Sequence, residues 1–238
     1  MRFFIEFSYN GKNYHGWQKQ SNAITVQEVL DTALSTLLRT KIETMGAGRT
    51  DAGVHASQMF AHFEIDTEMP DDIVFKLNSI LPDDIAVEHV FEVQKNAHAR
   101  FDAVSRNYEY RISIKKNVFN IDSAFAFIKP LDVEKMNKAC KILLEYSDFQ
   151  CFSKSNTDVK TYNCNISKAH WKTKGDELIF EIKADRFLRN MVRAIVGTMI
   201  EIGSSKISEN DLHNIIKSKN RSRAGFSVPA HGLYLTEI

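Results

Sequence analysis

A single aspartate, Asp51, lies among three glycines in the segment GAGRTDAGVHA, residues 46–56. Glycine tolerates tight and left-handed backbone conformations, so a sharp turn around this carboxylate is expected. A carboxylate in such a turn can bond to its own backbone, bind a metal ion, or act as a nucleophile or base.

The surroundings of Asp51 offer no recognisable metal or hydrolase motif. The nearest acids, Glu43 and Glu64, have no ligand spacing, and His55 has no HExxH or DxD partner. A nucleophile elbow, a GxxxxGK[ST] loop and a GxGxxG loop are all lacking. Two interpretations of Asp51 stay open: an Asx-turn residue, or a carboxylate that the turn projects into a cleft.

Arginines form the second group of interest, on a helix expected over residues 186–201. At 100° per residue, Arg186, Arg189, Arg193 and Gly197 fall on one stripe, and apolar residues occupy the opposite arc. The guanidinium group can bind a phosphate or a carboxylate through two parallel hydrogen bonds. The stripe is therefore either a solvated face or a binding face.

The elements that must position these residues alternate between strand and helix patterns. Phe3, Ile5, Phe7 and Tyr9 share one face of a first strand, and Thr25 caps a helix with Glu28 three residues later. We expect further strands over residues 57–65, 85–92, 106–114, 162–171 and 177–184, helices over 71–80, after Asp132, over 186–201 and over 208–218, and a final strand in GLYLTEI. Two strand–helix–strand halves, 1–103 and 104–238, predict an α+β fold with an antiparallel or mixed sheet.

Composition limits the class of protein. No apolar run approaches a membrane span, and the N-terminus has no signal-peptide pattern. Three cysteines without CxxC spacing favour reduced thiols, so we expect a cytoplasmic protein with no membrane association. Residues 1–99 carry a charge balance of −6 and residues 100–238 one of +7, which leaves a polyanionic partner for the second half open beside scattered solvated lysines.

The segment GRTDAGVHA resembles the signature of the tRNA pseudouridine synthase A family. Six further segments match the family in order: YNGKNYHGWQKQ with TVQEVL, LPDDIAV, HARFDAVSRNYEYRI, SDFQCF, ADRFLRNMVRAIVGTM and VPAHGLYL. Departures are modest, such as Ala97 where the family often has an aromatic residue. The resemblance implies two ferredoxin-like (RRM-like) α/β halves that form one continuous, mainly antiparallel sheet flanked by helices, with the active cleft between the halves.

The resemblance also implies an activity: isomerisation of uridine to pseudouridine at positions 38, 39 and 40 of the tRNA anticodon stem-loop. It implies no metal and no cofactor, and it implies tRNA and a second copy of the chain, in a homodimer, as partners. The C1′–N1 glycosidic bond breaks and a C1′–C5 bond forms, which requires one nucleophile. The family position makes Asp51 this nucleophile, attacking either uracil C6 or ribose C1′.

Four further residues receive roles from the resemblance. Arg193 is implied as the partner of Asp51, since a neighbouring guanidinium favours the ionised carboxylate. Tyr108 is implied as a catalytic and uracil-stacking residue, although it also fits a strand face with Tyr110. Arg49 is a candidate for filling the space vacated by the flipped base, for contacting the flipped nucleotide or for steadying its loop. Arg189 is a candidate for binding the substrate.

Other basic residues of the second half are candidates for contacts with tRNA phosphates, each with a solvated surface charge as the alternative. They are Lys154, Lys160, Lys168, Lys172, Lys174, Lys217, Lys219, Arg221 and Arg223. An RNA-binding module without catalysis and a small-molecule hydrolase are the competing interpretations of the chain.

Overall fold

A computed structural model describes residues 1–155 and 159–238. Contacts divide the chain into two compact units. The first comprises Met1–Val104 together with Tyr234–Ile238, and the second comprises Ser105–Leu233. The final strand, predicted within the second half of the chain, therefore packs with the first unit.

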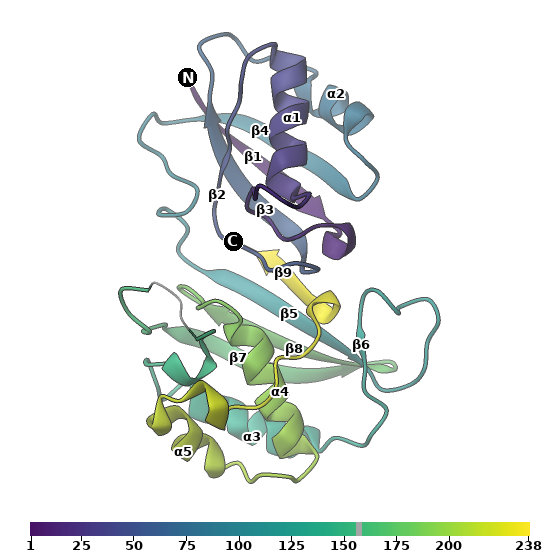
Figure 1. The fold of residues 1–238 in the computed structure, drawn as a ribbon, viewed down its shortest axis with the longest axis vertical. Coiled ribbons are helices and arrows are strands. Elements are labelled where there is room, and N and C mark those ends of the chain that lie inside the picture. The colour runs from purple at the N-terminus through teal and green to yellow at the C-terminus, as the bar shows by residue number, and fades with distance from the viewer. Residues whose placement is uncertain (156–158) are drawn as a thin grey trace. The chain divides into compact units, whose positions relative to one another are not determined.

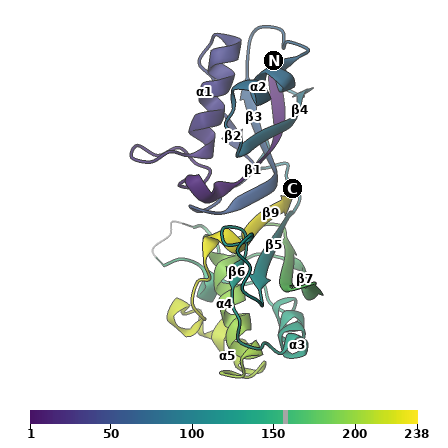
Figure 2. The same cartoon turned by 90° about the vertical axis from the view of Figure 1, so that its right-hand side faces the viewer.

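The first unit is built on strands in the order β4-β1-β3-β9, with the short β2 beside β3 (Figure 1). Strand β1 is antiparallel to β3 and β4, β2 is antiparallel to β3, and β9 is parallel to β3. Helix α1 lies along one face of these strands (Figure 2), and α2 contacts α1 and β4. The bounds are β1 Arg2–Tyr9, α1 Val26–Leu38, β2 Met45–Gly46, β3 His55–Glu64, α2 Ile73–Ile80, β4 Ile85–Val93 and β9 Leu233–Glu237.

Local sequence signals account for the start of this unit. The predicted alternation of β1 is confirmed, because Phe3, Ile5, Phe7 and Tyr9 are all buried while the intervening residues are partly exposed. The predicted cap of α1 is confirmed as well, since the Thr25 hydroxyl accepts a hydrogen bond from the Glu28 N–H. The strand and the helix that precede the Asp51 turn are thus determined by nearby residues.

The second unit has β8 antiparallel to both β5 and β7, and the short β6 parallel to β5. Helix α3 packs against β7 and α4, and its predicted cap, Asp132, accepts from the Lys135 N–H. The bounds are β5 Arg106–Ser113, β6 Phe125–Ala126, α3 Val133–Leu143, β7 Ile166–Lys174, β8 Glu177–Ala184, α4 Met191–Gly203 and α5 Asp211–Ser218. Both units confirm the predicted α+β class with mixed, mainly antiparallel strands.

The predicted start of the helix over residues 186–201 is wrong. Helix α4 begins at Met191, because Asn190 has a left-handed backbone conformation (φ 65°) that interrupts any helix before it. The strand predicted over 162–171 also lies later, at Ile166–Lys174, and the helix predicted over 208–218 begins at Asp211. The single arginine stripe is consequently wrong, since Arg186 and Arg189 precede the helix.

The three cysteines, Cys140, Cys151 and Cys164, are free thiols buried in the second unit. Burial raises the pKa of each thiol to about 12, so all three are protonated at neutral pH. Within residues 1–155 and 159–238, no helix combines the length and apolar character that a membrane span requires.

Candidate active site

Asp51 lies half-buried in the loop between β2 and β3. The Val54 N–H donates to the Asp51 carbonyl (3.2 Å), which closes a four-residue turn. Gly53, the third residue of the turn, has φ 77°, a conformation that favours glycine. The turn is therefore closed by the main chain, so its closure does not require the carboxylate.

The segment from Tyr9 to Trp17 holds the turn from the side. The Tyr9 and Thr50 hydroxyls share a buried hydrogen bond of 2.8 Å, and the Trp17 N–H donates to the Thr50 carbonyl (3.3 Å). The Gly53 N–H donates to the Tyr14 carbonyl (3.2 Å). These bonds fix the main chain on both sides of Asp51.

Two glycines of that segment allow the backbones to approach closely. A Cβ on Gly11 would collide with the Val54 carbonyl, and one on Gly16 with the Thr50 carbonyl. The Gly11 N–H also donates to His55 Nδ1 (3.1 Å), which assigns the buried His55 a structural role. The motifs YNGKNYHGW and GRTDAGVHA therefore form one packed unit.

Arg49 occupies the same loop, two residues before Asp51, and its side chain is exposed. The intervening Thr50 is buried and hydrogen-bonded. The loop thus presents an arginine at the surface of the first unit while anchoring the chain immediately before the aspartate.

Tyr108 and Tyr110 share a face of β5, but their surroundings differ. The Tyr108 ring is half-buried and meets the edge of the Phe187 ring, with centroids 5.1 Å apart and planes at 88°. Tyr110 is fully buried and donates its hydroxyl to the Pro229 carbonyl (2.8 Å). Desolvation raises the pKa of Tyr110, so this hydroxyl stays protonated and only Tyr108 retains solvent access.

Arg193 is the third residue of α4 and is half-buried. Its Nε donates to the Val228 carbonyl (2.7 Å), while the Val228 N–H donates to the Arg193 carbonyl (3.3 Å). The guanidinium is therefore oriented through one of its five N–H donors.

Arg189 lies in the turn before α4 with an exposed side chain, and its carbonyl accepts from the Lys154 N–H (3.0 Å). Arg186 is half-exposed, and its main-chain N–H donates to Asp185 Oδ1 (2.7 Å). Of the predicted site residues, Asp51 and Arg49 belong to the first unit, and Tyr108, Arg189 and Arg193 to the second.

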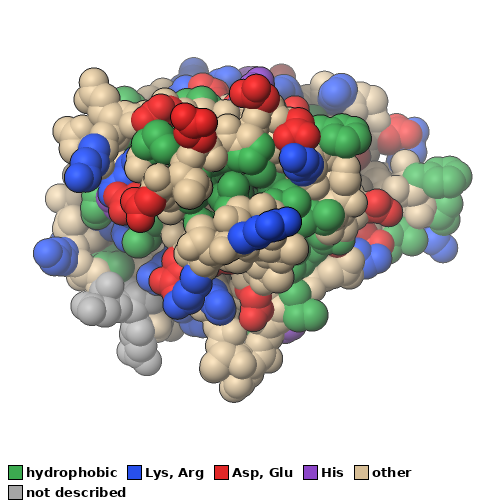
Figure 3. Space-filling view, turned by 90° about the horizontal axis from the view of Figure 1, so that it is seen from above, with side chains coloured by type: hydrophobic (Ala, Val, Ile, Leu, Met, Phe, Trp, Pro, Cys, Tyr) green, Lys and Arg blue, Asp and Glu red, His purple; other side chains and the backbone are tan. Residues whose placement is uncertain are grey.

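Several basic residues proposed for phosphate contacts bond within the chain. Lys168 and Lys172 both pair with Glu181 (2.7 and 2.6 Å), and Lys219 pairs with Asp148 (2.7 Å). Figure 3 views the molecule from above, the side on which α1 and α2 lie in Figure 1, and on that face acidic and basic side chains are interspersed. Ion pairs within the second unit therefore engage three of the lysines that contribute to the positive charge balance of the second half.

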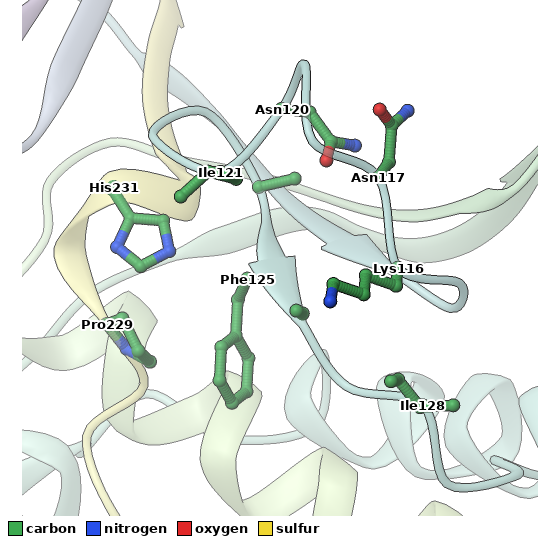
Figure 4. A pocket seen from close by; sticks show the side chains of 10 residues that line it. Lys116, Asn117, Asn120, Ile121, Phe125, Ile128, Pro229 and His231 are labelled. Atoms are coloured by element: carbon green, nitrogen blue, oxygen red, sulfur yellow. The ribbon is translucent and has the colours of Figure 1, made fainter.

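A hollow of about 400 Å³ lies in the second unit between the segment after β5 and the segment before β9. Phe125, Pro229 and His231 line one side, and the Lys116 side chain extends into it (Figure 4). None of the predicted site residues lines this hollow. Among the described residues, no group of three or more His, Cys, Asp or Glu side chains could hold a metal ion.

The family model described as tRNA pseudouridine synthase matches residues 6–102 and 139–238. The matched segments include Arg49, Asp51, Arg189 and Arg193, and Tyr108 lies between them. The chain belongs to the tRNA pseudouridine synthase family. This family consists of isomerases, and membership confirms the resemblance that the GRTDAGVHA segment carries.

Curated relatives named tRNA pseudouridine synthase A match along the full chain. The protein of Parabacteroides distasonis is 52% identical, with 100% of this chain and 95% of the relative covered. That of Bacteroides fragilis is 51% identical over 100% and 95%, and that of a Thermoanaerobacter species is 40% identical over 98% and 97%.

Sequence reasoning missed the residues that support the site. Tyr9 was predicted only as a strand-face residue, and Gly11 and Gly16 appeared only as parts of a matching segment. The glycine pair in YNGKNYHG was the signal for close backbone contact. Arg221 was grouped with phosphate-binding residues, but its guanidinium bonds to the chain between residues 224 and 227.

Proposed function

We propose that this protein isomerises uridine to pseudouridine at positions 38, 39 and 40 of the tRNA anticodon stem-loop. The observation that carries the proposal is the full-length match to the tRNA pseudouridine synthase family, with GRTDAGVHA intact around Asp51. The half-buried position of Asp51 in a turn closed by main-chain bonds supports its use in chemistry.

Asp51 acts as the nucleophile, at uracil C6 or at ribose C1′. The C1′–N1 bond breaks, the uracil rotates while it is held, and C1′ bonds to C5. C5 then loses its hydrogen as a proton, and N1 gains a proton. The aspartate is released unchanged, so the reaction balances without an oxidant or a second substrate. A carboxylate attacks only when ionised, and a rigid turn reduces the reorganisation needed to reach the reacting atom.

Arg193 is the partner of Asp51 and favours the ionised carboxylate. Its fixed guanidinium suits this role because the bond from Nε to the Val228 carbonyl orients the fork. Tyr108 stacks on the uracil and assists proton transfer at C5, a role that its partial exposure supports.

Arg49 contacts the flipped nucleotide, and Arg189 binds the tRNA substrate. Both side chains are exposed, and extrusion of a base from a stem costs a few kcal/mol that such contacts help to offset. The enzyme acts as a homodimer in the cytoplasm. Three free, buried cysteines fit a reducing compartment.

The experiment is incubation of the full chain with an unmodified tRNA transcript that has uridines at 38, 39 and 40. Pseudouridine is mapped by carbodiimide adducts and primer extension, and sedimentation reports the oligomeric state. We expect adducts at these positions only. Tight tRNA binding without any adduct would favour the RNA-binding module instead.

A further inference from the structure

A short segment, Ala224–Val228, crosses the N-terminal half of α4, and we call it the strap. The Gly225 N–H donates to the Thr198 hydroxyl (2.9 Å), and a Cβ on Gly225 would lie 2.6 Å from the Thr198 nitrogen. On the helix side, a Cβ on Gly197 would collide with the Phe226 carbonyl. Two glycines thus let the strap pack directly on the helix backbone.

The strap ends at the residue that orients Arg193. Val228 accepts from Arg193 Nε (2.7 Å) and donates its N–H to the Arg193 carbonyl (3.3 Å). A displacement of the strap therefore moves the acceptor that fixes the guanidinium, even though no strap side chain takes part in either bond.

Arg221 holds the strap from its other end. Its Nη1 donates to the Gly225 carbonyl (2.9 Å) and the Ala224 carbonyl (3.3 Å), and its Nη2 donates to the Ser227 hydroxyl (2.8 Å). A lysine at this position has no planar fork and cannot reproduce this pattern of donors.

The Ser227 hydroxyl also links the strap to the start of α4. Ser227 Oγ also accepts from Asn190 Nδ2 (2.7 Å), and a hydroxyl oxygen has two lone pairs for these two donors. Asn190 is the left-handed residue immediately before α4. Arg221, Ser227 and Asn190 therefore connect the strap to the helix end that carries Arg193.

We infer that Arg221 is a positioning residue for the isomerisation: it fixes the strap, and through Val228 it fixes the guanidinium of Arg193. This inference rests on the proposed role of Arg193. It also gives Arg221 a function other than phosphate binding, because its donors are used on the chain itself.

The test compares Arg221→Ala and Arg221→Lys with Lys206→Ala, which removes a charge from an exposed site of the same unit. We expect Arg221→Ala to lower kcat at saturating tRNA by roughly tenfold or more, with the tRNA Kd within about threefold. Arg221→Lys should recover only part of the loss. Lys206→Ala should retain kcat.

A double-mutant cycle separates positioning from general destabilisation. In an Arg193→Lys background, the kcat loss caused by Arg221→Ala should shrink to within about twofold, because both changes disable the same guanidinium. Independent, multiplicative losses would overturn the inference, as would a change confined to Kd. If Arg221→Ala does not fold, Ser227→Ala takes its place in the same cycle, because this variant removes one of the acceptors of Arg221.

A readout independent of activity distinguishes failure of this inference from failure of the proposed function. The Arg193 Nε–H signal of the full chain, labelled with ¹⁵N-arginine, should be protected from solvent exchange in the wild type. It should lose this protection in Arg221→Ala and keep it in Lys206→Ala. Unchanged protection in Arg221→Ala would contradict the inference even if the enzyme were inactive.

Discussion

The Asp51 turn and the Arg193 region hold their key side chains by different means. Around Asp51, main-chain bonds and glycines fix the backbone, and the contacts come from Tyr9–Trp17 in the same unit. Around Arg193, a side-chain bond to Val228 fixes the guanidinium itself, and Arg221 and Asn190 secure that acceptor. The proposed nucleophile depends on backbone geometry, and its proposed partner on a side-chain network.

Asp51→Glu tests whether the backbone turn fixes the carboxylate. The charge is retained, but the carboxylate moves outward by one methylene from a backbone that cannot follow. Misplacement by about 1 Å can cost roughly 100-fold, so we expect a loss of at least that size in single-turnover rate. A near-normal rate would show that the turn does not fix the position of the carboxylate.

Arg193→Lys tests the side-chain network with a smaller expected effect. Lysine keeps the charge but loses the fork that both bonds Val228 and can engage a carboxylate, so we expect kcat to fall roughly tenfold or more. The measurement is turnover at saturating tRNA. Normal turnover would mean that charge alone suffices and that the bidentate geometry is unnecessary.

Substitutions at two glycines test, through the free energy of unfolding, whether close backbone packing supports the Asp51 turn. Gly16→Ala places a Cβ against the Thr50 carbonyl at φ 87°, and overpacking of this kind costs about 1–3 kcal/mol. Gly48→Ala is the matched control in the same region, since a Cβ there meets nothing within 4 Å.

Urea unfolding of the full chain should therefore show a clear loss of stability for Gly16→Ala only. Its pseudouridine formation should fall as well, because the main chain before Asp51 is displaced. Equal midpoints for the two variants would contradict the proposed packing of the two motifs.

The smallest expected effect concerns ion pairing in the second unit. Hydrogen bonds from Lys168 and Lys172 lower the pKa of Glu181 from 4.5 to about 2. A depressed carboxyl pKa contributes stability above its unfolded value, and this stability is lost as pH falls toward about 2. Since both lysines are partly exposed, Glu181→Gln should cost only about 1 kcal/mol at pH 7.

Unfolding measured from pH 7 to pH 2 should show the two proteins converging below about pH 4.5. A difference that stayed constant with pH would assign the cost to packing instead of charge.

Local signals explain what could be predicted from the sequence. Thr25 and Asp132 cap helices within three residues, and β1 alternates with a strict period of two. The Asp51 turn could be predicted for a similar reason, because its glycines report backbone geometry directly. The contacts that support the turn come from residues about 40 positions away. The sequence indicated them only through the presence of two glycine-rich motifs, YNGKNYHGW and GRTDAGVHA.

The start of α4 and the role of Arg221 could not be predicted in this way. The helical pattern of apolar residues continues through Asn190. Its left-handed conformation goes with a side-chain bond to Ser227, 37 residues later in the sequence, which local patterns do not reveal. Arg221 is a basic residue in a basic half of the chain, which is typical of phosphate binding. Its bonds to main-chain carbonyls form only once the strap is folded, so the sequence does not predict them. At Asn190 a bond to a residue 37 positions away overrides the helical pattern, whereas the bonds of Arg221 are short in sequence and depend on how the strap folds.

The assignment of Asp51 as the nucleophile of a tRNA uridine isomerase can be tested directly. Its most direct test is tritium release from tRNA labelled at uridine C5, measured for the wild type and for Asp51→Asn, with tRNA affinity measured in parallel. We predict release by the wild type, none by Asp51→Asn, and affinities within a few-fold of each other. Release by Asp51→Asn at the wild-type rate would show that Asp51 is not the nucleophile, because the amide cannot serve as one.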